Sequence, residues 1–344
     1  MRSFVPFESL WAMPIEVPYS FLVRDCNSAW TCGQLALNEN SEIIAPGDLT
    51  AQSEVVCDYI ETILPDAKLE KPSLRRLLLY YIHRNDNSRD AMVAIFRKRF
   101  GDHVLLDPIP VPHYYYEGVE LEVDVFCDVE PGAMRSIVED SSAITIRGET
   151  QLFVSLWTDN LDLDQAYAHV AEAVGPEFIC MNEHWFLPED CKAKRKDHPD
   201  PGSLLSAGPS QTKTLGLFTF VQKTDPVRDD VTTVNEVTLV FRTCGGRSWL
   251  QARCLDGDLG LVEQTDRIMR EIEGTLKKQR LSFSDVVKST THYVGGSANE
   301  LHDNMQVRNK YYRKPGPAST GLPVFGFQDR NSRVVVDLTL IKAG

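Results

Sequence analysis

The feature that most constrains this 344-residue sequence is an internal repeat. Alternating apolar residues predict strands, and apolar residues three and four positions apart predict helices. These patterns give a β-β-α-β-α-β unit near the N-terminus, and the same order returns in the last third of the chain. The elements of the first copy cover 19–23, 28–37, 50–64, 77–82, 89–100 and 119–126, and those of the second cover 237–241, 249–255, 263–276, 286–294, 299–312 and 333–341. The predicted fold class is therefore α+β, built from tandem units.

The middle of the chain carries a weaker version of the same pattern. The sequence there predicts a strand, a helix and a strand over 151–155, 163–174 and 178–187. A glutamine lies near the start of one helix in each third of the chain, which suggests a third, eroded copy; these residues are Gln52, Gln165 and Gln264. The charged, Pro- and Gly-rich stretch 192–211 predicts a solvated loop. We expect a first unit over 1–130, a degenerate middle unit over 131–232 and a last unit over 233–344.

Composition narrows the expected partners. The net charge of −13 argues against nucleic acid, because affinity for phosphate backbones depends on Lys and Arg clusters. The sequence has no run of about 18 apolar residues and no signal-peptide pattern, so we expect a cytoplasmic protein without membrane contact. Its eight cysteines are spread singly, without the spacing of metal ligands or of a disulfide framework. A small molecule is the expected partner, with no metal and no cofactor.

Short motifs in the first unit resemble a known family. They are Pro18-Tyr19, Cys32-Gly33-Gln34 where the family usually has Ser-Gly-Gln, Pro46-Gly47-Asp48, Ala51-Gln52 and the acidic closing strand 119–124. Through these motifs the unit resembles the RidA (YjgF/UK114) family, and the last unit is similar in element order. The resemblance implies chorismate-mutase-like units whose sheets form an internal β-barrel, with ligand sites in the clefts between three units. The chain would then be an intramolecular pseudo-trimer, a tandem member distantly similar to chorismatases.

Deaminases of this family hold a substrate carboxylate with an Arg just before the last hairpin. Counting back from the closing strand places Asp107 at this position in the first unit and Ser319 in the last unit. Neither side chain can form the bidentate pair that Arg makes with a carboxylate. Arg253 in the last unit could supply the missing cation. The usual 2-imino-acid substrate of the family is therefore not expected.

The resemblance also implies catalytic residues. The family's water-orienting Glu corresponds to Glu122 in the first unit and to Asp337 in the last, and a cleft-lining Tyr corresponds to Tyr19. The carboxylates of Glu120, Glu122 and Asp124 alternate along one strand and so share one face. If that face lines a cleft, one of these carboxyls has a raised pKa. If it faces solvent, the pattern is an ordinary sheet surface.

Other residues are candidates for substrate binding. Cys32 and Gln34 lie in the family's loop, where Cys32 is either a nucleophile or an inert buried thiol. Ser319 and Thr320 form either an anion-binding turn or a plain turn. Tyr115 lies at an aromatic hairpin tip that covers a planar substrate or packs against a neighbouring unit. Three histidines fall near equivalent strands of the three units: His83, His184 and His292. They either form a threefold cluster or lie there by chance.

Together these residues favour an enzyme that acts on an imine, enamine or enol-type small molecule by water addition or proton transfer. Without the Arg clamp, we expect a specialised biosynthetic step rather than general detoxification. Hydrolysis of an imine requires a carboxylate that positions water and donors for the developing charge. Two alternatives stay open: a chorismatase-like hydrolase or lyase that uses Asp337 as its acid, and a binding protein without catalysis. Because one chain would replace a trimer, we expect a monomer or a homodimer.

Overall fold

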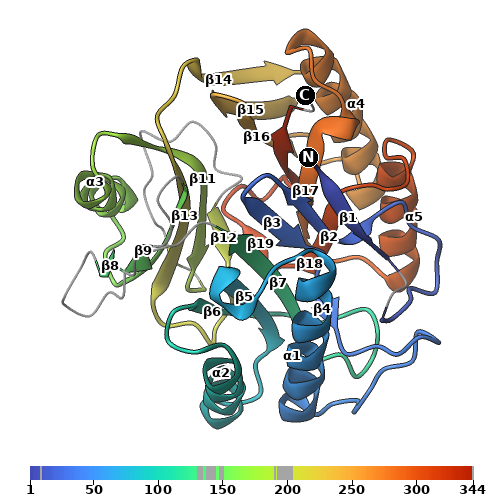
Figure 1. Ribbon diagram of the computed structural model, residues 1–344. Coiled ribbons are helices and arrows are strands. Elements are labelled where there is room, and N and C mark those ends of the chain that lie inside the picture. The colour runs from blue at the N-terminus through green and yellow to red at the C-terminus, as the bar shows by residue number, and fades with distance from the viewer. Residues whose placement is uncertain are drawn as a thin grey trace.

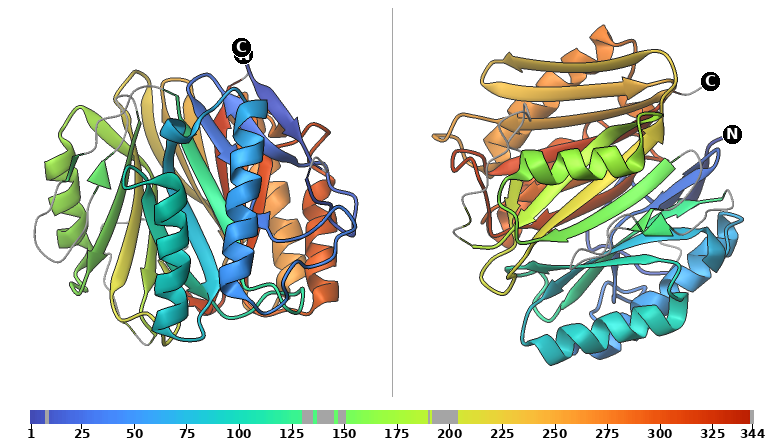
Figure 2. Two further views of the ribbon diagram at one scale, coloured as in Figure 1. Left: turned by 60° about the horizontal axis from the view of Figure 1, so that its bottom comes forward. Right: turned by 90° about the vertical axis from the view of Figure 1, so that its left-hand side faces the viewer.

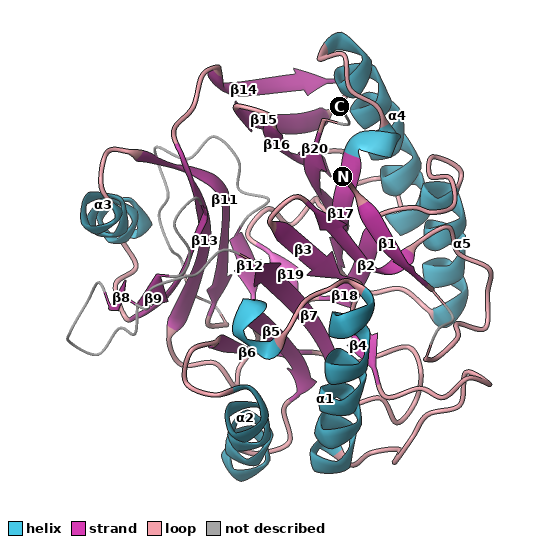
Figure 3. Cartoon of the chain, viewed as in Figure 1, coloured by secondary structure: helices cyan, strands magenta, loops and turns pink. Residues whose placement is uncertain are grey.

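The protein is a mixed α+β structure, as the sequence predicts. The computed structural model describes residues 1–7, 10–129, 135–136, 145–146, 151–189, 191 and 204–342. Strands fill the centre of the molecule and the α-helices lie on the outside (Figures 1 and 3). Both ends of the chain lie at the same end of the molecule (Figure 2). No helix within the described ranges is long and apolar enough to cross a membrane.

The first unit consists of six strands covered by two helices. Its elements are β2 (Ser20–Asp25), β3 (Ser28–Thr31), β4 (Gln34–Leu35), α1 (Leu49–Asp66), β5 (Leu74–Ile82), α2 (Asp86–Phe100), β6 (Leu105–Val111) and β7 (Leu121–Asp128). The strand order is β2-β3-β7-β5-β6, and β4 also pairs with β7. Asp48 caps α1 by accepting from the backbone N of Ala51 at 2.9 Å. Apolar residues of α1, among them Val56 and Ile60, are fully buried in the core beneath it.

The last unit repeats this arrangement. Its elements are β15 (Val237–Cys244), β16 (Arg247–Cys254), α4 (Leu261–Lys278), β17 (Val286–Tyr293), α5 (Ala298–Asn309), β18 (Ala318–Pro323) and β20 (Val334–Ile341). The strand order β15-β16-β20-β17-β18 is that of the first unit. Ser297 and Glu300 form the capping box of α5. The predicted β-β-α-β-α-β order was wrong by one strand in each unit. An additional strand precedes the closing strand: β6, which pairs in parallel with β5, and β18, which pairs in parallel with β17.

The middle of the chain has the same strand order without the first strand. Its elements are β10 (Gln151–Thr158), α3 (Leu163–Val174), β11 (Phe178–Leu187), β12 (Leu204–Ser206) and β13 (Thr214–Gln222). The order β10-β13-β11-β12 matches β16-β20-β17-β18 of the last unit. The strand after the first helix has a register shift near its start in all three segments, between Leu74 and Arg76, Cys180 and Asn182, and Val286 and Lys288. Of the predicted loop 192–211, residues 192–203 lie outside the described residues, and β12 occupies part of the remainder.

Two large sheets result from these pairings. The first and last units join through a parallel contact between Ser20 of β2 and Ala318 of β18, and with β1 (Ser3–Pro6) and β14 (Val227–Val234) they make a 13-stranded sheet. The middle strands form a five-stranded sheet that ends on β19 (Gly326–Phe327). A separate pair consists of β8 (Arg135–Ser136) and β9 (Thr145–Ile146). Within the described residues no strand pairing joins the two sheets, so the expected closed barrel is not confirmed.

The three segments share an interior where their sheets meet. Its apolar core takes residues from each of them, such as Leu78, Phe186 and Leu322. Polar side chains cross the same interior and link the segments in pairs. The links are Lys288 Nζ to Asp124 Oδ1 at 2.8 Å, Arg76 Nη2 to Ser155 Oγ at 3.2 Å, and His184 Nε2 to Asp337 Oδ2 at 3.2 Å. The segments are therefore held together by buried polar contacts as well as by apolar packing.

Candidate functional site

A cavity lies between the first and last units. Its volume of about 90 Å³ is several times the ~10–15 Å³ that one water occupies on the same measure, so it can hold a small molecule. Most of its wall is aromatic or aliphatic, and the polar side chains in it are few. They include Tyr19, Cys32, Glu122, Arg308 and Ser319. This composition is typical of a small-molecule site.

Gly33 brings the loop between β3 and β4 against the carboxyl group of Glu122. A Cβ atom on Gly33 would lie 1.7 Å from Glu122 Oε1, so only glycine permits this approach. The neighbouring Cys32 lines the cavity, and its Sγ accepts a hydrogen bond from Gln34 Nε2 at 3.2 Å. Burial raises the pKa of the Cys32 thiol well above its usual range, which leaves it neutral and weakly nucleophilic. Gln34 holds the loop through hydrogen bonds from its Nε2 to Cys32 and does not line the cavity.

Glu122 is the carboxyl group of the cavity. It lies on β7 and is 7% exposed. Burial raises the pKa of Glu122 well above its usual range; the charge of Asp124 adds to this rise, and Lys288 opposes it. Among the described residues its side chain has no hydrogen-bond partner. Its raised pKa favours the protonated form of Glu122, whose proton would then face the cavity.

Arg308 is a functional residue that the sequence reasoning missed. It extends from α5 into the cavity, where Nε donates to Asn304 Oδ1 at 3.0 Å and Nη1 donates to Thr291 Oγ1 at 2.9 Å. Within the described chain Nη2 has no hydrogen-bond partner, and it lies beside Gly321, where the missing side chain leaves space. The signal in the sequence was the spacing of Asn304 and Arg308, which places both on the helix face that carries Met305.

Three further donors around the cavity lack partners. The hydroxyl groups of Tyr19 and Tyr116 and the indole Nε1 of Trp11 are buried without a hydrogen-bond acceptor in the described structure. Each unpaired buried donor costs roughly 1–3 kcal/mol. A ligand with acceptor atoms would satisfy them. Trp11 belongs to the segment before β2, which the sequence analysis did not assign to the site.

Tyr115 and Ser319 also lie at the cavity, as expected. The Tyr115 hydroxyl donates to the carbonyl oxygen of Gly295, and its ring lies 5.6 Å from the ring of Tyr293, so it packs across the junction of the two units. Ser319 lines the wall on β18. The next residue, Thr320, faces the shared interior and donates to Asp124, because successive side chains of a strand point to opposite faces.

Asp337 and Arg253 lie outside this cavity. The pairing of β7 with β5 and of β20 with β17 makes Asp337 equivalent to Asp124. The position equivalent to Glu122 is therefore Val335 and not Asp337. Asp337 instead contacts His184 in the shared interior. Arg253 is paired with Asp329 and does not supply a cation to the cavity.

Two of the remaining sequence expectations also need correction. In the paired strands, Leu106 and Ser319 occupy equivalent positions of β6 and β18. The predicted equivalent, Asp107, lies one residue further along β6. The three histidines do not form a threefold cluster. His184 and His292 have ring centroids 5.6 Å apart, whereas His83 is bonded to the Tyr81 hydroxyl elsewhere.

The fold and the cavity define a class of protein: a chain of α+β segments that share one strand order and enclose a ligand-sized site between the first and the last. Solved structures similar to part of the chain include Rid-family proteins. The YjgF gene product from E. coli is 19% identical over 37% of this chain and 99% of its own, with a TM-score of 0.32. A putative endoribonuclease from Thermotoga maritima is 20% identical over 38% of this chain and 99% of its own, with a TM-score of 0.33. The Rid-family protein YyfA from Yersinia pestis is 17% identical over 38% of this chain and 100% of its own, with a TM-score of 0.33. The sequence matches no protein-family model and no curated protein.

Proposed function

We propose that this protein is a divergent tandem RidA-like enzyme that acts on an imine, enamine or enol-type small molecule in the cavity between its first and last units. The observation that carries the proposal is that Glu122, whose pKa burial raises, and the Arg308 guanidinium line one largely apolar cavity. The shared strand order and the equivalent register shifts support three units, over 1–130, 131–232 and 233–344, in a pseudo-trimer.

Arg308 binds the anionic group of the substrate. Two of its nitrogens are fixed by Asn304 and Thr291, which orients the guanidinium plane and leaves Nη2 to the ligand. A guanidinium held in this way suits a carboxylate or a similar oxyanion. The cation thus comes from α5, whereas the family resemblance placed it on the strand that here carries Ser319. The aromatic wall receives the apolar part of the substrate.

Glu122 supplies the proton. An enamine accepts it at carbon and becomes an iminium ion, water adds to the iminium carbon, and one proton of that water returns to the Glu122 carboxylate. The carbinolamine then loses ammonia and leaves a carbonyl compound. A positioned acid contributes roughly 100- to 10,000-fold to such a rate. Tyr19, whose hydroxyl has no partner, donates to the substrate oxyanion or imine nitrogen.

The two alternatives differ in their support. The chorismatase-like hypothesis used Asp337 as the acid, and Asp337 lies in the shared interior, away from this cavity. That hypothesis therefore loses its catalytic residue here. A binding protein without catalysis keeps the same cavity and the same Arg308 contact, so only a rate measurement separates it from the enzyme.

The test is hydrolysis of imines generated in situ by an amino-acid oxidase from branched-chain and aromatic amino acids. The wild-type protein should accelerate ammonia release, and Glu122→Gln should reduce the accelerated rate at least 100-fold. Glu117→Gln is the matched control, because Glu117 is an exposed carboxylate near the same hairpin. Arg308→Met should raise KM strongly.

Several outcomes would contradict the proposal. Equal rates with and without wild-type protein for every imine would leave the binding protein as the better description. Full activity in Glu122→Gln would remove Glu122 from the mechanism. Consumption of chorismate by the wild-type protein would favour the chorismatase-like alternative. Light scattering after size exclusion tests the expected monomer or homodimer.

A further inference from the structure

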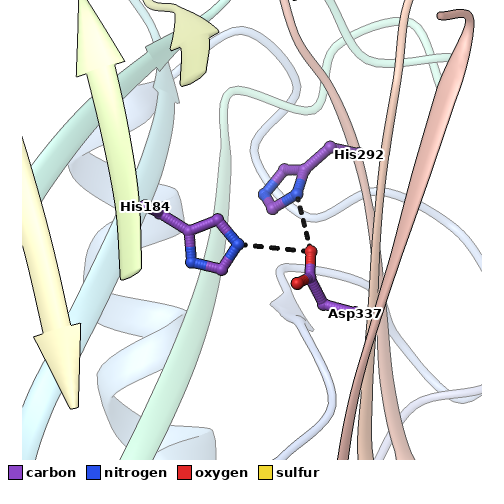
Figure 4. A group of neighbouring side chains, drawn as sticks. All are labelled: His184, His292 and Asp337. Atoms are coloured by element: carbon purple, nitrogen blue, oxygen red, sulfur yellow. Dashed lines mark hydrogen bonds and ion pairs between the residues drawn. The ribbon is translucent and has the colours of Figure 1, made fainter. Parts of the chain in front are cut away.

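Two histidines and an aspartate from distant parts of the chain converge in the shared interior. His184 comes from β11, His292 from β17 and Asp337 from β20, and their side chains point toward one another (Figure 4). His184 Nε2 lies 3.2 Å and His292 Nδ1 lies 3.8 Å from Asp337 Oδ2. One ligand atom from each residue lies within 4.8 Å of the other two.

We propose that His184, His292 and Asp337 bind a divalent transition-metal ion such as Zn²⁺. This donor set, two imidazoles and one carboxylate, suits Zn²⁺, Co²⁺ and Fe²⁺ better than the oxygen-preferring Mg²⁺ or Ca²⁺. Metal–ligand bonds of about 2.0–2.2 Å place neighbouring ligand atoms roughly 3.0–3.5 Å apart. The His184–Asp337 distance already falls in this range, and the His292–Asp337 distance exceeds it by only a few tenths of an ångström.

The second observation is the state of the His292 ring. His292 is 2% exposed, and neither of its ring nitrogens has a hydrogen-bond partner in the described structure. A buried polar ring without partners is costly, and coordination of a metal by Nδ1 would satisfy it.

The carboxylate is already oriented for this role. Gln251 Nε2 donates to Asp337 Oδ1 at 2.9 Å, which leaves Oδ2 directed at the two histidines. Hydrogen bonds of this kind fix the ligands of metal sites.

The charges around the site also favour a cation. In the adjoining cavity Lys288 is paired with Asp124, and Arg76 is paired with Asp107. Asp337 differs from those two carboxylates, because the partners described for it are two histidines and the Gln251 amide, with no Lys or Arg. The cavity volume of about 50 Å³ can hold one or more waters as further metal ligands. A metal at this point would connect β11 of the middle segment to β17 and β20 of the last unit.

The test uses the full-length protein, first stripped of metal with a chelator and then titrated with Co²⁺. We expect the visible d–d absorption of a site with nitrogen and oxygen ligands, saturating at one ion per chain, and Zn²⁺ should displace the Co²⁺. His292→Ala and Asp337→Asn should abolish the absorption. His169→Ala is the matched control, because His169 is exposed on α3 and should leave binding unchanged.

Gln251→Met keeps all three ligands and tests the assignment even if a ligand variant does not fold. It should weaken Co²⁺ binding roughly 10- to 100-fold, because it releases the carboxylate from its fixed orientation. Absence of bound Co²⁺ in the wild-type protein would overturn the proposal. Unchanged affinity in a folded His292→Ala variant would also overturn it, because the metal would then bind elsewhere.

Discussion

Replacing Glu122 by Gln should change how the stability of the protein depends on pH. Glu122 is buried and has no hydrogen-bond partner among the described residues, and burial raises its pKa well above the ordinary value of 4.5. In the unfolded chain the same carboxyl ionises near that ordinary value. Above it, the folded state holds a proton that the unfolded state has lost, so folding becomes less favourable as the pH rises.

The size of this effect follows from the linkage between protonation and folding. Stability contributed by Glu122 is fully present below its unfolded pKa and is lost as the pH rises toward its folded pKa. The loss is at most about 1.4 kcal/mol per pH unit. Between pH 5 and pH 7 the free energy of unfolding should therefore fall by up to about 2.7 kcal/mol more in the wild type than in Glu122→Gln.

The assay is urea unfolding of both proteins at half-unit pH steps from 4.5 to 8. The free energy of unfolding of Glu122→Gln relative to the wild type should rise steadily with pH. Glu117→Gln removes an exposed carboxyl and should give a curve parallel to that of the wild type. Parallel curves for Glu122→Gln as well would refute the argument, because they would mean that Glu122 ionises normally in the folded protein.

Three further predictions follow from the same cavity and interior. Gly33→Ala places a Cβ atom 1.7 Å from the Glu122 carboxyl and should lower the free energy of unfolding by roughly 1–3 kcal/mol in urea titrations; an unchanged value would contradict this close approach of the loop to Glu122. Iodoacetamide at pH 8 should label the exposed Cys26 in the native protein and Cys32 only after unfolding, as peptide mass spectrometry would show. Lys288→Met leaves a buried carboxylate unpaired and should cost about 3–5 kcal/mol, and a loss below 1 kcal/mol would show that the pair is solvated.

Several parts of the site could be predicted because they depend on local order along the chain. Alternation along the closing strand put Glu122 on one face with Glu120 and Asp124, and the structure shows that this face is buried. The loop at Cys32 and Gly33 lies beside Glu122 because β4 pairs with β7. The position of Tyr19 just before β2 brought it to the same cavity. Strands β6 and β18 escaped prediction because proline and glycine are depleted in strands. The prolines of β6 lie in an edge strand, and β18 pairs with its outer neighbour β2 only at Ala318.

The sequence by itself determined the repeat, the order of elements apart from β6 and β18, and which residues of a strand share a face, since these follow from periodicity and near neighbours. Only the tertiary structure decided which faces meet. Arg308 reaches the cavity from α5, and Asp337 joins His184 and His292 in the interior, because strand register and the packing of whole segments set these contacts. A shift of one residue in register would move each side chain to the opposite face, and no pattern along the chain fixes that register between distant strands.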